Sequence, residues 1–322
     1  MAETFDQPPI HPLSRTTCEH RRVRLGHGWS GSVMTACAGG ELGGDADEVW
    51  PTWSQWAEWL TLLIRAPDSL PGYEVLKQSG KGEVIRAHIE LPSRRLEVVC
   101  KRGAIRRIGQ RFLAMFRRSG AHRQFAKALG LLKAGIRTPL PLACLKRGFG
   151  GGEAWLVTTF VADAVDLDHI ALSLLSRVPP DRQRRVRNGV IEALAILFDR
   201  LEMHWVHHRD LKASNVMLTA WDQGAEEARA WLIDLEGVRL NVRMDESRIR
   251  QPVVRLTASL VSYSSVTQSD YCRFLHAYLP RMGTSPTHWK EHFRRLGHFA
   301  RRYREAAKQR KTHKLDGFSD GV

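Results

Sequence analysis

Two short segments constrain the fold more than any other part of the chain. Residues 208–215 read His-Arg-Asp-Leu-Lys-Ala-Ser-Asn, and residues 234–237 read Asp-Leu-Glu-Gly. Phosphoryl transfer needs a carboxylate beside the attacking hydroxyl, an amide oxygen a few residues later for magnesium, and a second carboxylate at the end of a nearby strand. Asp210, Asn215 and Asp234 meet these requirements in this order, so the two segments predict a phosphoryl-transfer site.

The rest of the first segment supports the same interpretation. It follows the pattern H-R-D-L-K-x-x-N of a phosphoryl-transfer catalytic loop, and a strand-like run, Trp231-Leu232-Ile233, leads into Asp234. Lys212 is placed to contact the transferring phosphoryl group as a point charge. We therefore take His208, Asp210 and Lys212 as the catalytic candidates. A surface loop of unrelated polar residues would be expected to lack both the pattern and the strand.

A nucleotide site is predicted upstream. Apolar and other residues alternate over 84–91 with the period of a strand, after a predicted turn at Ser-Gly-Lys-Gly, residues 79–82. A second strand ends at Lys101, in the order expected of a phosphate clamp, with the lysine pairing the α- and β-phosphates. Gly80 and Gly82 are the candidate phosphate-loop glycines, although the complete G-x-G-x-x-G pattern is absent.

The segment after Lys101 departs from protein kinases. Residues 98–152 contain thirteen Lys or Arg and no Asp or Glu, and residues 111–132 predict a helix with a break at 119–120. Protein kinases place a Glu on this helix to pair with the strand lysine, and here Gln124 is the nearest polar replacement. The apolar run 154–161 then predicts a strand that carries a hinge, with Thr159 placed beneath the adenine.

The first 70 residues divide in two. Prolines and glycines predict an irregular extension over residues 1–48, and a Trp-rich helix over 49–70 is expected to begin after the cap residue Thr52. Its tryptophans recur every third residue from Trp50 to Trp59. This run predicts a helix packed against a lobe or, alternatively, an interfacial belt that touches membrane.

The remainder of the chain is expected to form two lobes. We assign residues 71–161 to an N-terminal lobe (N-lobe), residues 162–314 to a C-terminal lobe (C-lobe) and residues 315–322 to a tail. In the C-lobe a long helix should begin after the Pro179-Pro180 pair, with Asp181 as its cap and an apolar stripe at 186, 190, 194, 197 and 201. Helices are also expected over 271–279 and 288–310, the latter as a core helix or as a basic face on anionic membrane. A metal site at the clustered His204, His207 and His208 is less favoured than a structural role.

Composition limits partners and compartment. The net charge of +15 over 322 residues attracts anionic partners. We therefore expect an anionic glycolipid or saccharide acceptor and an anionic membrane surface as partners. Nucleic acid is disfavoured, because no binding motif with interleaved aromatics occurs. Five cysteines without a C-x-x-C pair favour a reducing compartment. With no secretory signal or membrane-length apolar run visible, we expect a cytoplasmic protein, either free or peripheral on the inner face of the cytoplasmic membrane.

Three local features carry a family resemblance. They are Val-Leu-Lys-Gln-Ser at 75–79 before a glycine-poor loop, Ala-Gly-Ile-Arg-Thr-Pro-Leu-Pro-Leu-Ala at 134–143, and Ile-Asp-Leu-Glu-Gly at 233–237 in place of the usual D-F-G. Over about residues 70–280 the chain resembles the lipopolysaccharide kinases (Kdo/heptose kinases) of the protein-kinase-like superfamily. The resemblance implies an α+β, bilobal fold with a small β-rich N-lobe and a mainly helical C-lobe. It also implies ATP and Mg²⁺, Asp210 as base, and Asn215 and Asp234 as metal ligands.

The expected activity is therefore ATP-dependent phosphorylation of a sugar hydroxyl of the lipopolysaccharide inner core (Kdo or heptose) or a similar glycolipid. No A-P-E segment follows Gly237, and this segment anchors the activation loop of protein kinases. The alternatives are a small-molecule phosphotransferase of the aminoglycoside type, an atypical protein kinase, and a nucleotide-binding pseudokinase. The missing helix carboxylate favours the pseudokinase, whereas the intact Asp210, Lys212, Asn215 and Asp234 speak against it.

Overall fold

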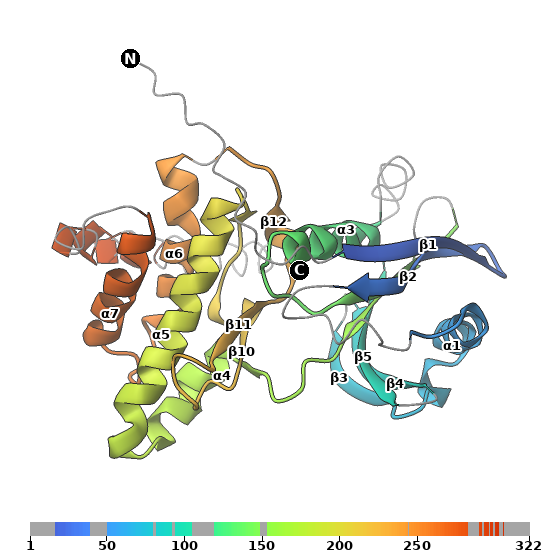
Figure 1. The fold of residues 1–322 in the computed structure, drawn as a ribbon, viewed down its shortest axis with the longest axis horizontal. Coiled ribbons are helices and arrows are strands. Elements are labelled where there is room, and N and C mark those ends of the chain that lie inside the picture. The colour runs from blue at the N-terminus through green and yellow to red at the C-terminus, as the bar shows by residue number, and fades with distance from the viewer. Residues whose placement is uncertain are drawn as a thin grey trace, which may run out of the picture. The chain divides into compact units, whose positions relative to one another are not determined.

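A computed structural model describes residues 17–38, 50–79, 82–91, 94–104, 119–148, 153–243 and 245–282, and part of 290–305. The chain divides into two compact units between Val161 and Ala162. The first unit is built on a β-sheet and the second is mainly helical (Figure 1). This α+β architecture agrees with the predicted fold class. Predicted features at residues 1–16, 39–49, Gly80, 105–118 and the tail 315–322 lie outside the described residues.

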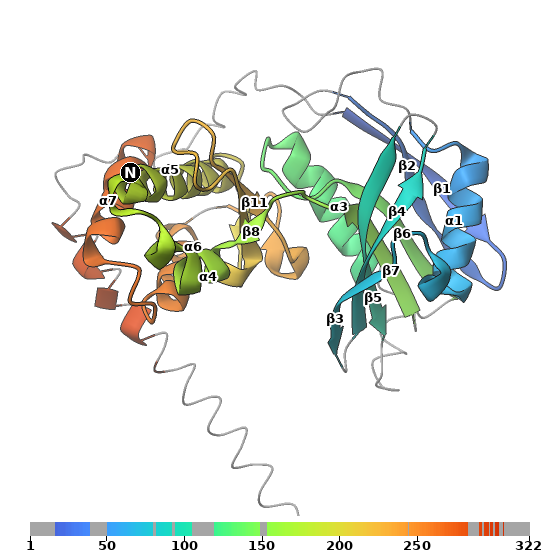
Figure 2. The ribbon, with the colours of Figure 1, turned by 90° about the horizontal axis from the view of Figure 1, so that it is seen from below.

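The first unit contains one antiparallel sheet of seven strands. In spatial order they are β1 (Thr17–Leu25), β2 (Trp29–Ala38), β6 (Pro141–Arg147), β7 (Glu153–Thr159), β5 (Arg95–Ala104), β4 (Gly82–Glu90) and β3 (Glu74–Ser79). Two helices, α1 (Trp53–Arg65) and α3 (Gly120–Lys133), lie on opposite sides of it (Figure 2). A 3₁₀ turn, η1 (Pro67–Ser69), follows α1.

Strand alternation gives each helix its own core. Trp155 and Val157 of β7 pack in the cluster that contains the buried residues of α1, whereas their neighbours Ala154 and Leu156 pack with Phe125 of α3. Successive strand residues point to opposite faces of a sheet. Each face of β7 is therefore buried, which explains why this segment reads as a continuous apolar run.

The predicted irregular extension over residues 1–48 is wrong in its described part. Residues 17–38 form the hairpin β1–β2, and β2 joins the sheet through β6. The turn at Gly26-His27-Gly28 places His27 and Gly28 at positive φ, 59° and 77°, the backbone that such turns require. A β-bulge between Glu19 and His20 shifts the register, and this shift interrupts the alternation that would mark a strand.

Helix α1 begins where the sequence predicts. Thr52 caps it through a capping box: Gln55 N donates to Thr52 Oγ1 at 3.4 Å, and Thr52 N donates to Gln55 Oε1 at 2.8 Å. Trp56 and Trp59 are buried, and Trp59 Nε1 donates to the His88 carbonyl at 3.0 Å. Trp56 and Trp59 therefore belong to the core of the first unit, as the packing interpretation of this helix predicts, whereas Trp53 is exposed.

The second unit is organised around the long helix α5 (Pro180–Met203). Other helices in its described part are α4 (Leu167–His169), α6 (Glu246–Leu260) and α7 (Gln268–Tyr278), and further helical residues lie within 290–305. The π-helical turn η2 (Ile170–Leu174) and the 3₁₀ turns η3 (Leu175–Arg177), η4 (Ala213–Asn215), η5 (Leu235–Gly237) and η6 (Leu279–Met282) complete the described elements of this kind. Strands β11 (Arg229–Leu232), β10 (Val216–Thr219) and β8 (Val165–Asp166) form one small sheet, and β12 (Val238–Arg239) pairs with β9 (His207–His208).

The apolar stripe of α5 is confirmed. All five of its predicted residues are buried: Val186, Val190, Leu194, Leu197 and Leu201. Phe198 adds edge-on aromatic contacts to α7, at 5.6 Å to Phe274 and 6.0 Å to Tyr278 between ring centroids. Asp181 is not the cap, because the helix begins at Pro180 and Asp181 lies in its first turn. Among the described residues no helix is both long and apolar enough to cross a bilayer.

Candidate active site

Residues 208–215 and 234–237 lie side by side in the second unit. Strand β9 pairs with β12, with His208 opposite Val238, and Arg209 N donates to the Gly237 carbonyl at 3.1 Å. A Cβ on Gly237 would lie only 3.2 Å from the amide nitrogen of Asp210. The absence of a side chain at Gly237 therefore lets residues 234–237 pack closely against the loop.

Residues 208–215, which we call the catalytic loop, alternate between buried anchors and exposed polar groups. His208, Leu211, Ala213 and Asn215 are buried, whereas Asp210 and Lys212 are exposed. The imidazole of His208 accepts a hydrogen bond at Nδ1 from Asp210 N at 3.1 Å. His208 therefore anchors the loop from its buried side, while Asp210 and Lys212 are exposed to solvent, where an acceptor could reach them.

Asn215 and Asp234 are brought together by backbone contacts. Asn215 Nδ2 donates to the Asp210 carbonyl at 2.8 Å, and Ile233 N donates to the Asn215 carbonyl at 3.0 Å. Asp234 follows directly, in the left-handed region at φ 56°, which Asp tolerates better than most residues but at a cost of about 1 kcal/mol or more. The structure thus keeps an exposed carboxylate in a strained backbone next to Asn215.

The donor set suits magnesium. The amide nitrogen of Asn215 is engaged in the loop, so its oxygen is the atom suited to a cation, and Asp234 supplies a carboxylate. Mg²⁺ is usually held by one or two protein oxygen ligands together with substrate phosphates, so these residues fit it. No group of three or more His, Cys, Asp or Glu within the described residues could hold a metal. The alternative of a histidine metal site is therefore not supported.

Sequence reasoning missed a second layer of contacts to the loop, which comes from α6. Arg255 Nη1 donates to Asp210 Oδ1 at 2.8 Å, Gln251 Oε1 lies 2.8 Å from His207 Nε2, and Ser259 Oγ accepts from Ala213 N at 2.9 Å. These partners are 44 to 46 residues apart, so no local pattern could have paired them.

The contact at His207 has a defined protonation preference. Burial lowers the pKa of His207 below its ordinary value, the hydrogen bond with Gln251 raises it, and the nearby cations Arg248, Arg239 and Arg209 lower it further. The lowered pKa favours a neutral ring at pH 7. A neutral His207 can donate from Nε2 to the Gln251 oxygen without placing another positive charge beside the loop.

The nucleotide candidates lie in the first unit. Lys101 is within β5, opposite Leu156 of β7, three residues before the strand ends rather than at its end. It therefore lies on the sheet face that packs against α3, where Gln124 is buried. That Gln124 orients Lys101 stays a prediction.

The glycines and Thr159 have local structural roles. A Cβ on Gly82 would lie 2.0 Å from the Arg102 carbonyl oxygen, so the close approach of β5 already explains this glycine. Gly80 lies outside the described residues. Thr159 Oγ1 accepts a hydrogen bond from Leu140 N at 2.9 Å, so its hydroxyl links the end of β7 to the segment before β6.

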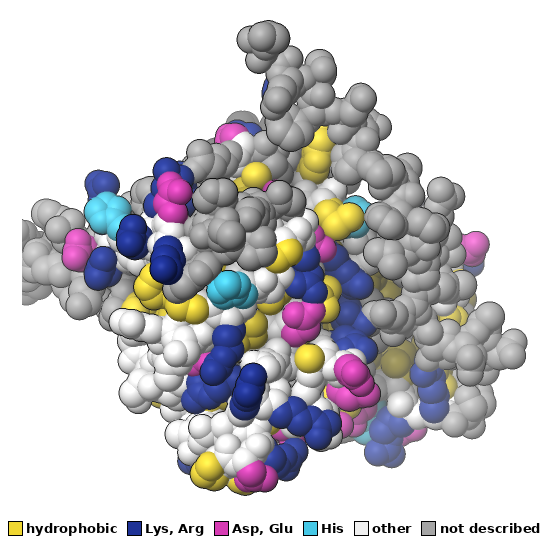
Figure 3. All heavy atoms as spheres, turned by 60° about the vertical axis from the view of Figure 1, so that its left-hand side comes forward, with side chains coloured by type: hydrophobic (Ala, Val, Ile, Leu, Met, Phe, Trp, Pro, Cys, Tyr) yellow, Lys and Arg dark blue, Asp and Glu magenta, His cyan; other side chains and the backbone are white. Residues whose placement is uncertain are grey.

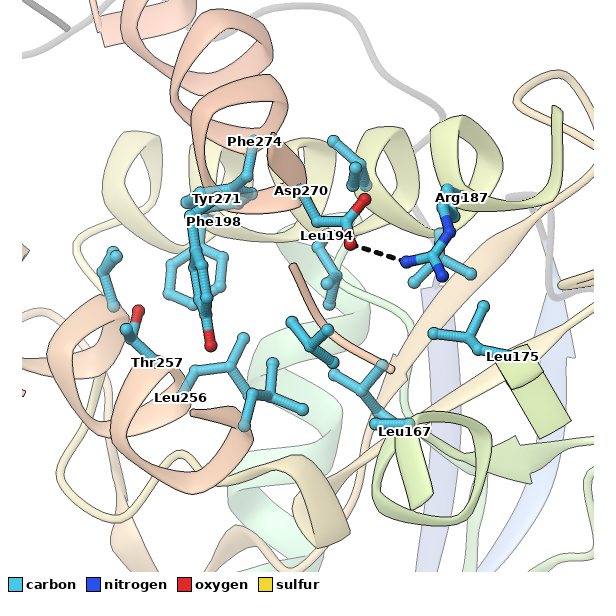
Figure 4. Close-up of a pocket in the computed structure, with 16 residues that line it drawn as sticks. Leu167, Leu175, Arg187, Leu194, Phe198, Leu256, Thr257, Asp270, Tyr271 and Phe274 are labelled. Carbon is cyan, nitrogen blue, oxygen red and sulfur yellow. Dashed lines mark hydrogen bonds and ion pairs between the residues drawn. The ribbon is translucent and has the colours of Figure 1, made fainter. Parts of the chain in front are cut away.

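An apolar pocket lies elsewhere in the second unit (Figure 4). It is lined by residues of α4, η2, α5, α6 and α7, with Leu167, Leu194 and Phe274 among its apolar residues. The ion pair of Arg187 with Asp270, 2.6 Å, lies at its wall. None of the predicted site residues lines this pocket.

The described surface is basic in many places. Figure 3 shows Lys and Arg side chains distributed over the visible face, with Asp and Glu among them. Among the described residues, several arginines form ion pairs, such as Arg255 with Asp210 and Arg248 with Asp245. The positive charge is therefore spread over several elements rather than concentrated in one stripe.

A β-rich unit, a helical unit, and a catalytic loop whose Asp210 and Asn215 lie beside the segment that carries Asp234 are the features of a phosphotransferase of the protein-kinase-like class. The model of the lipopolysaccharide kinase (Kdo/WaaP) family matches residues 95–278, more than half of the chain. The chain belongs to this family and is a kinase that acts on lipopolysaccharide.

Comparison with solved structures supports the fold. A structure described as WaaP in complex with acyl carrier protein has a TM-score of 0.53 at 21% identity, and the match covers 76% of this chain and 91% of that one. The kinase domain of BubR1 is matched at a TM-score of 0.38 and 13% identity, over 54% of this chain and 48% of that one, which is too distant to carry an argument. No curated protein sequence matches the chain.

Proposed function

We propose that the chain transfers the γ-phosphoryl group of ATP to a sugar hydroxyl, Kdo or heptose, of the lipopolysaccharide inner core. One observation carries the catalytic assignment: the catalytic loop and residues 234–237 are joined by β9–β12 pairing and by the Ile233–Asn215 bond. Family membership supports lipopolysaccharide as the acceptor. The reaction takes place in the cytoplasm, where ATP is available.

In the proposed reaction Asp210 accepts the proton of the acceptor hydroxyl. The hydroxyl oxygen bonds to the γ-phosphorus, the bond from that phosphorus to the bridging oxygen breaks, and ADP leaves. Lys212 stabilises charge on the transferring group. Lys101 holds the α- and β-phosphates, while Gly80, Gly82 and Thr159 contribute to the nucleotide site.

Asn215 and Asp234 are the proposed magnesium ligands. Bound Mg²⁺ would neutralise charge on the β- and γ-phosphates. Replacing Asp234 by Asn removes the charged oxygen ligand and should raise the Mg²⁺ concentration needed for half-maximal turnover. The same variant should also bind Mn²⁺ more weakly in the presence of ATP. Paramagnetic relaxation measures this binding and provides a readout besides activity.

The test is an acceptor panel with γ-labelled ATP and Mg²⁺. Lipid A–Kdo, heptose-containing core, a protein mixture and aminoglycosides are supplied separately to the wild type and to Asp210→Asn. Label in the saccharide acceptors from the wild type alone is the expected result. Label only in protein or only in an aminoglycoside would establish the corresponding alternative instead, and nucleotide binding without any transfer would identify a pseudokinase.

We also propose a protein partner that carries an acyl chain. WaaP was solved in complex with acyl carrier protein, and the apolar pocket of the second unit offers a site of the polarity that an acyl chain needs. Calorimetric titration should show tighter binding of palmitoyl carrier protein than of the same protein without an acyl chain. Equal affinity of both forms would exclude a role for the pocket.

A further inference from the structure

Three side chains of α6 contact the catalytic loop at regular intervals. Gln251, Arg255 and Ser259 are four residues apart, so they lie on one face of the helix, roughly one turn from each other. Their partners in the loop region, His207, Asp210 and Ala213, are three residues apart. One face of α6 therefore follows the catalytic loop along its length.

The three contacts act on different parts of the loop. Gln251 holds the ring of His207 immediately before the loop begins, and Ser259 accepts the buried amide of Ala213 while donating to the Leu256 carbonyl at 2.7 Å. Arg255 contacts the Asp210 carboxylate itself, and its side chain is only 20% exposed against 60% for Asp210. A shielded guanidinium thus holds an exposed carboxylate.

We propose that α6 aligns the catalytic loop and that Arg255 is the positioning residue for the Asp210 carboxylate. This inference rests on the proposed role of Asp210 as base. Arginine presents its donors in a rigid planar fork, which fixes the rotamer of a carboxylate better than the flexible ammonium of lysine. With one oxygen held by Arg255, the other carboxylate oxygen is directed to the acceptor hydroxyl.

The position of Arg255 has a consequence for the reaction. Loss of an outer partner of a metal ligand typically lowers activity about 10- to 100-fold, and we expect a loss of similar size for the outer partner of Asp210. Since Arg255 acts through Asp210, this loss should appear in kcat, with little change in KM for either substrate. An arginine that bound the acceptor directly would instead raise the KM of the acceptor.

The kinetic test compares Arg255→Gln and Arg255→Lys with Arg248→Gln. Arg248 is on the same helix but contacts Asp245 and the Arg243 carbonyl, so its variant controls for the loss of one charge. The expected kcat is about 10- to 100-fold lower for Gln, partly restored by Lys, and unchanged for the control. An unchanged kcat in Arg255→Gln, or a raised acceptor KM alone, would overturn the positioning role.

A second measurement does not depend on turnover. Hydrogen exchange of the peptide that covers residues 207–215 should be at least about threefold faster in Ser259→Ala and in Arg255→Gln, because each change releases part of the loop from α6. Arg248→Gln should exchange like the wild type. Each variant is measured at the same temperature interval below its own Tm, so that differences in global stability do not contribute. If the wild type transfers no phosphoryl group, the proposed function fails, and exchange still decides the alignment. Unchanged hydrogen exchange in both Arg255→Gln and Ser259→Ala would refute the alignment of the loop by α6.

Discussion

The carboxylate of Asp270 joins three parts of the second unit. Its Oδ2 accepts from Arg187 Nη1 at 2.6 Å and from Thr267 N at 2.9 Å, and its Oδ1 accepts from Arg273 Nη1 at 3.0 Å. Asp270 therefore completes the capping box of α7 and ties that helix to α5. Replacement of Asp270 by Asn keeps the shape of the side chain and removes its charge.

The cost follows from the burial of the pair. Arg187 and Asp270 side chains are 14% and 11% exposed, and removing one partner of a buried ion pair costs about 3–5 kcal/mol. Arg187 keeps its hydrogen bond to the Ser265 carbonyl at 2.8 Å, and the side-chain oxygen of Asn can still accept the hydrogen bond from Thr267 N. We therefore expect Asp270→Asn to lower the free energy of unfolding by about 3 kcal/mol. At about 2–4 °C per kcal/mol, this lowers Tm by about 6–12 °C.

Thermal and urea unfolding measure this loss. Asp245→Asn is the matched control, because Asp245 also stabilises a helix N-terminus: it is the N-cap of α6 and accepts from Arg248 N at 2.8 Å. Its side chain is 57% exposed, so the expected loss of unfolding free energy is below about 1 kcal/mol. Replacing both partners, Arg187→Met with Asp270→Leu, should recover much of the stability. A Tm of Asp270→Asn within about 2 °C of the wild type would contradict this expectation. So would a double variant whose loss of unfolding free energy equals the sum of the losses in Arg187→Met and Asp270→Leu.

Two further predictions concern the loop and pH. Gly237→Ala places a Cβ 3.2 Å from Asp210 N and from the His208 ring, so we expect kcat to fall about three- to tenfold through a small displacement of the loop, with Gly120→Ala, where a Cβ meets nothing within 4 Å, as the control in the same assay. Burial raises the pKa of Glu202 from 4.5 to about 7, although the hydrogen bond from Tyr278 acts to lower it. The folded state therefore binds the proton more tightly than the unfolded state. The contribution of Glu202 to the free energy of unfolding is complete below about pH 4.5 and is lost as pH rises through about 7. Glu202→Gln should flatten that part of the stability profile in urea unfolding, and a profile that parallels the wild type across this range would contradict the burial effect.

Local patterns predicted the parts of the fold that local chemistry determines. The cap at Thr52 and the apolar stripe of α5 each involve residues a few positions apart. The sequence also predicts a catalytic loop, because its chemistry demands a carboxylate and an amide at fixed spacing on one short segment. For these features the interactions that stabilise the structure lie within the same stretch of sequence.

The missed features depend on distant partners. Strand β1 is an edge strand, with arginines 21, 22 and 24 exposed, and its bulge disturbs the alternation of side chains, so only the Gly26-His27-Gly28 turn signalled a hairpin. Arg255 resembled any other helix arginine until the fold placed it beside Asp210. Asp181 was expected to cap α5, but Pro180 already starts the helix, as proline at the first helical position does.

The place of the β1–β2 hairpin in the sheet has a consequence for folding during synthesis. The hairpin is made early, yet β2 can be covered only when β6, roughly a hundred residues later, has left the ribosome, a delay of about 5–20 s at ordinary synthesis rates. During that interval the edge around Gly31, where even a Cβ would collide with the Cys144 carbonyl at 1.9 Å, has no neighbour. The edge of the hairpin on the other side is β1, whose exposed arginines 21, 22 and 24 carry like charges that oppose pairing with other chains both during synthesis and in the finished sheet.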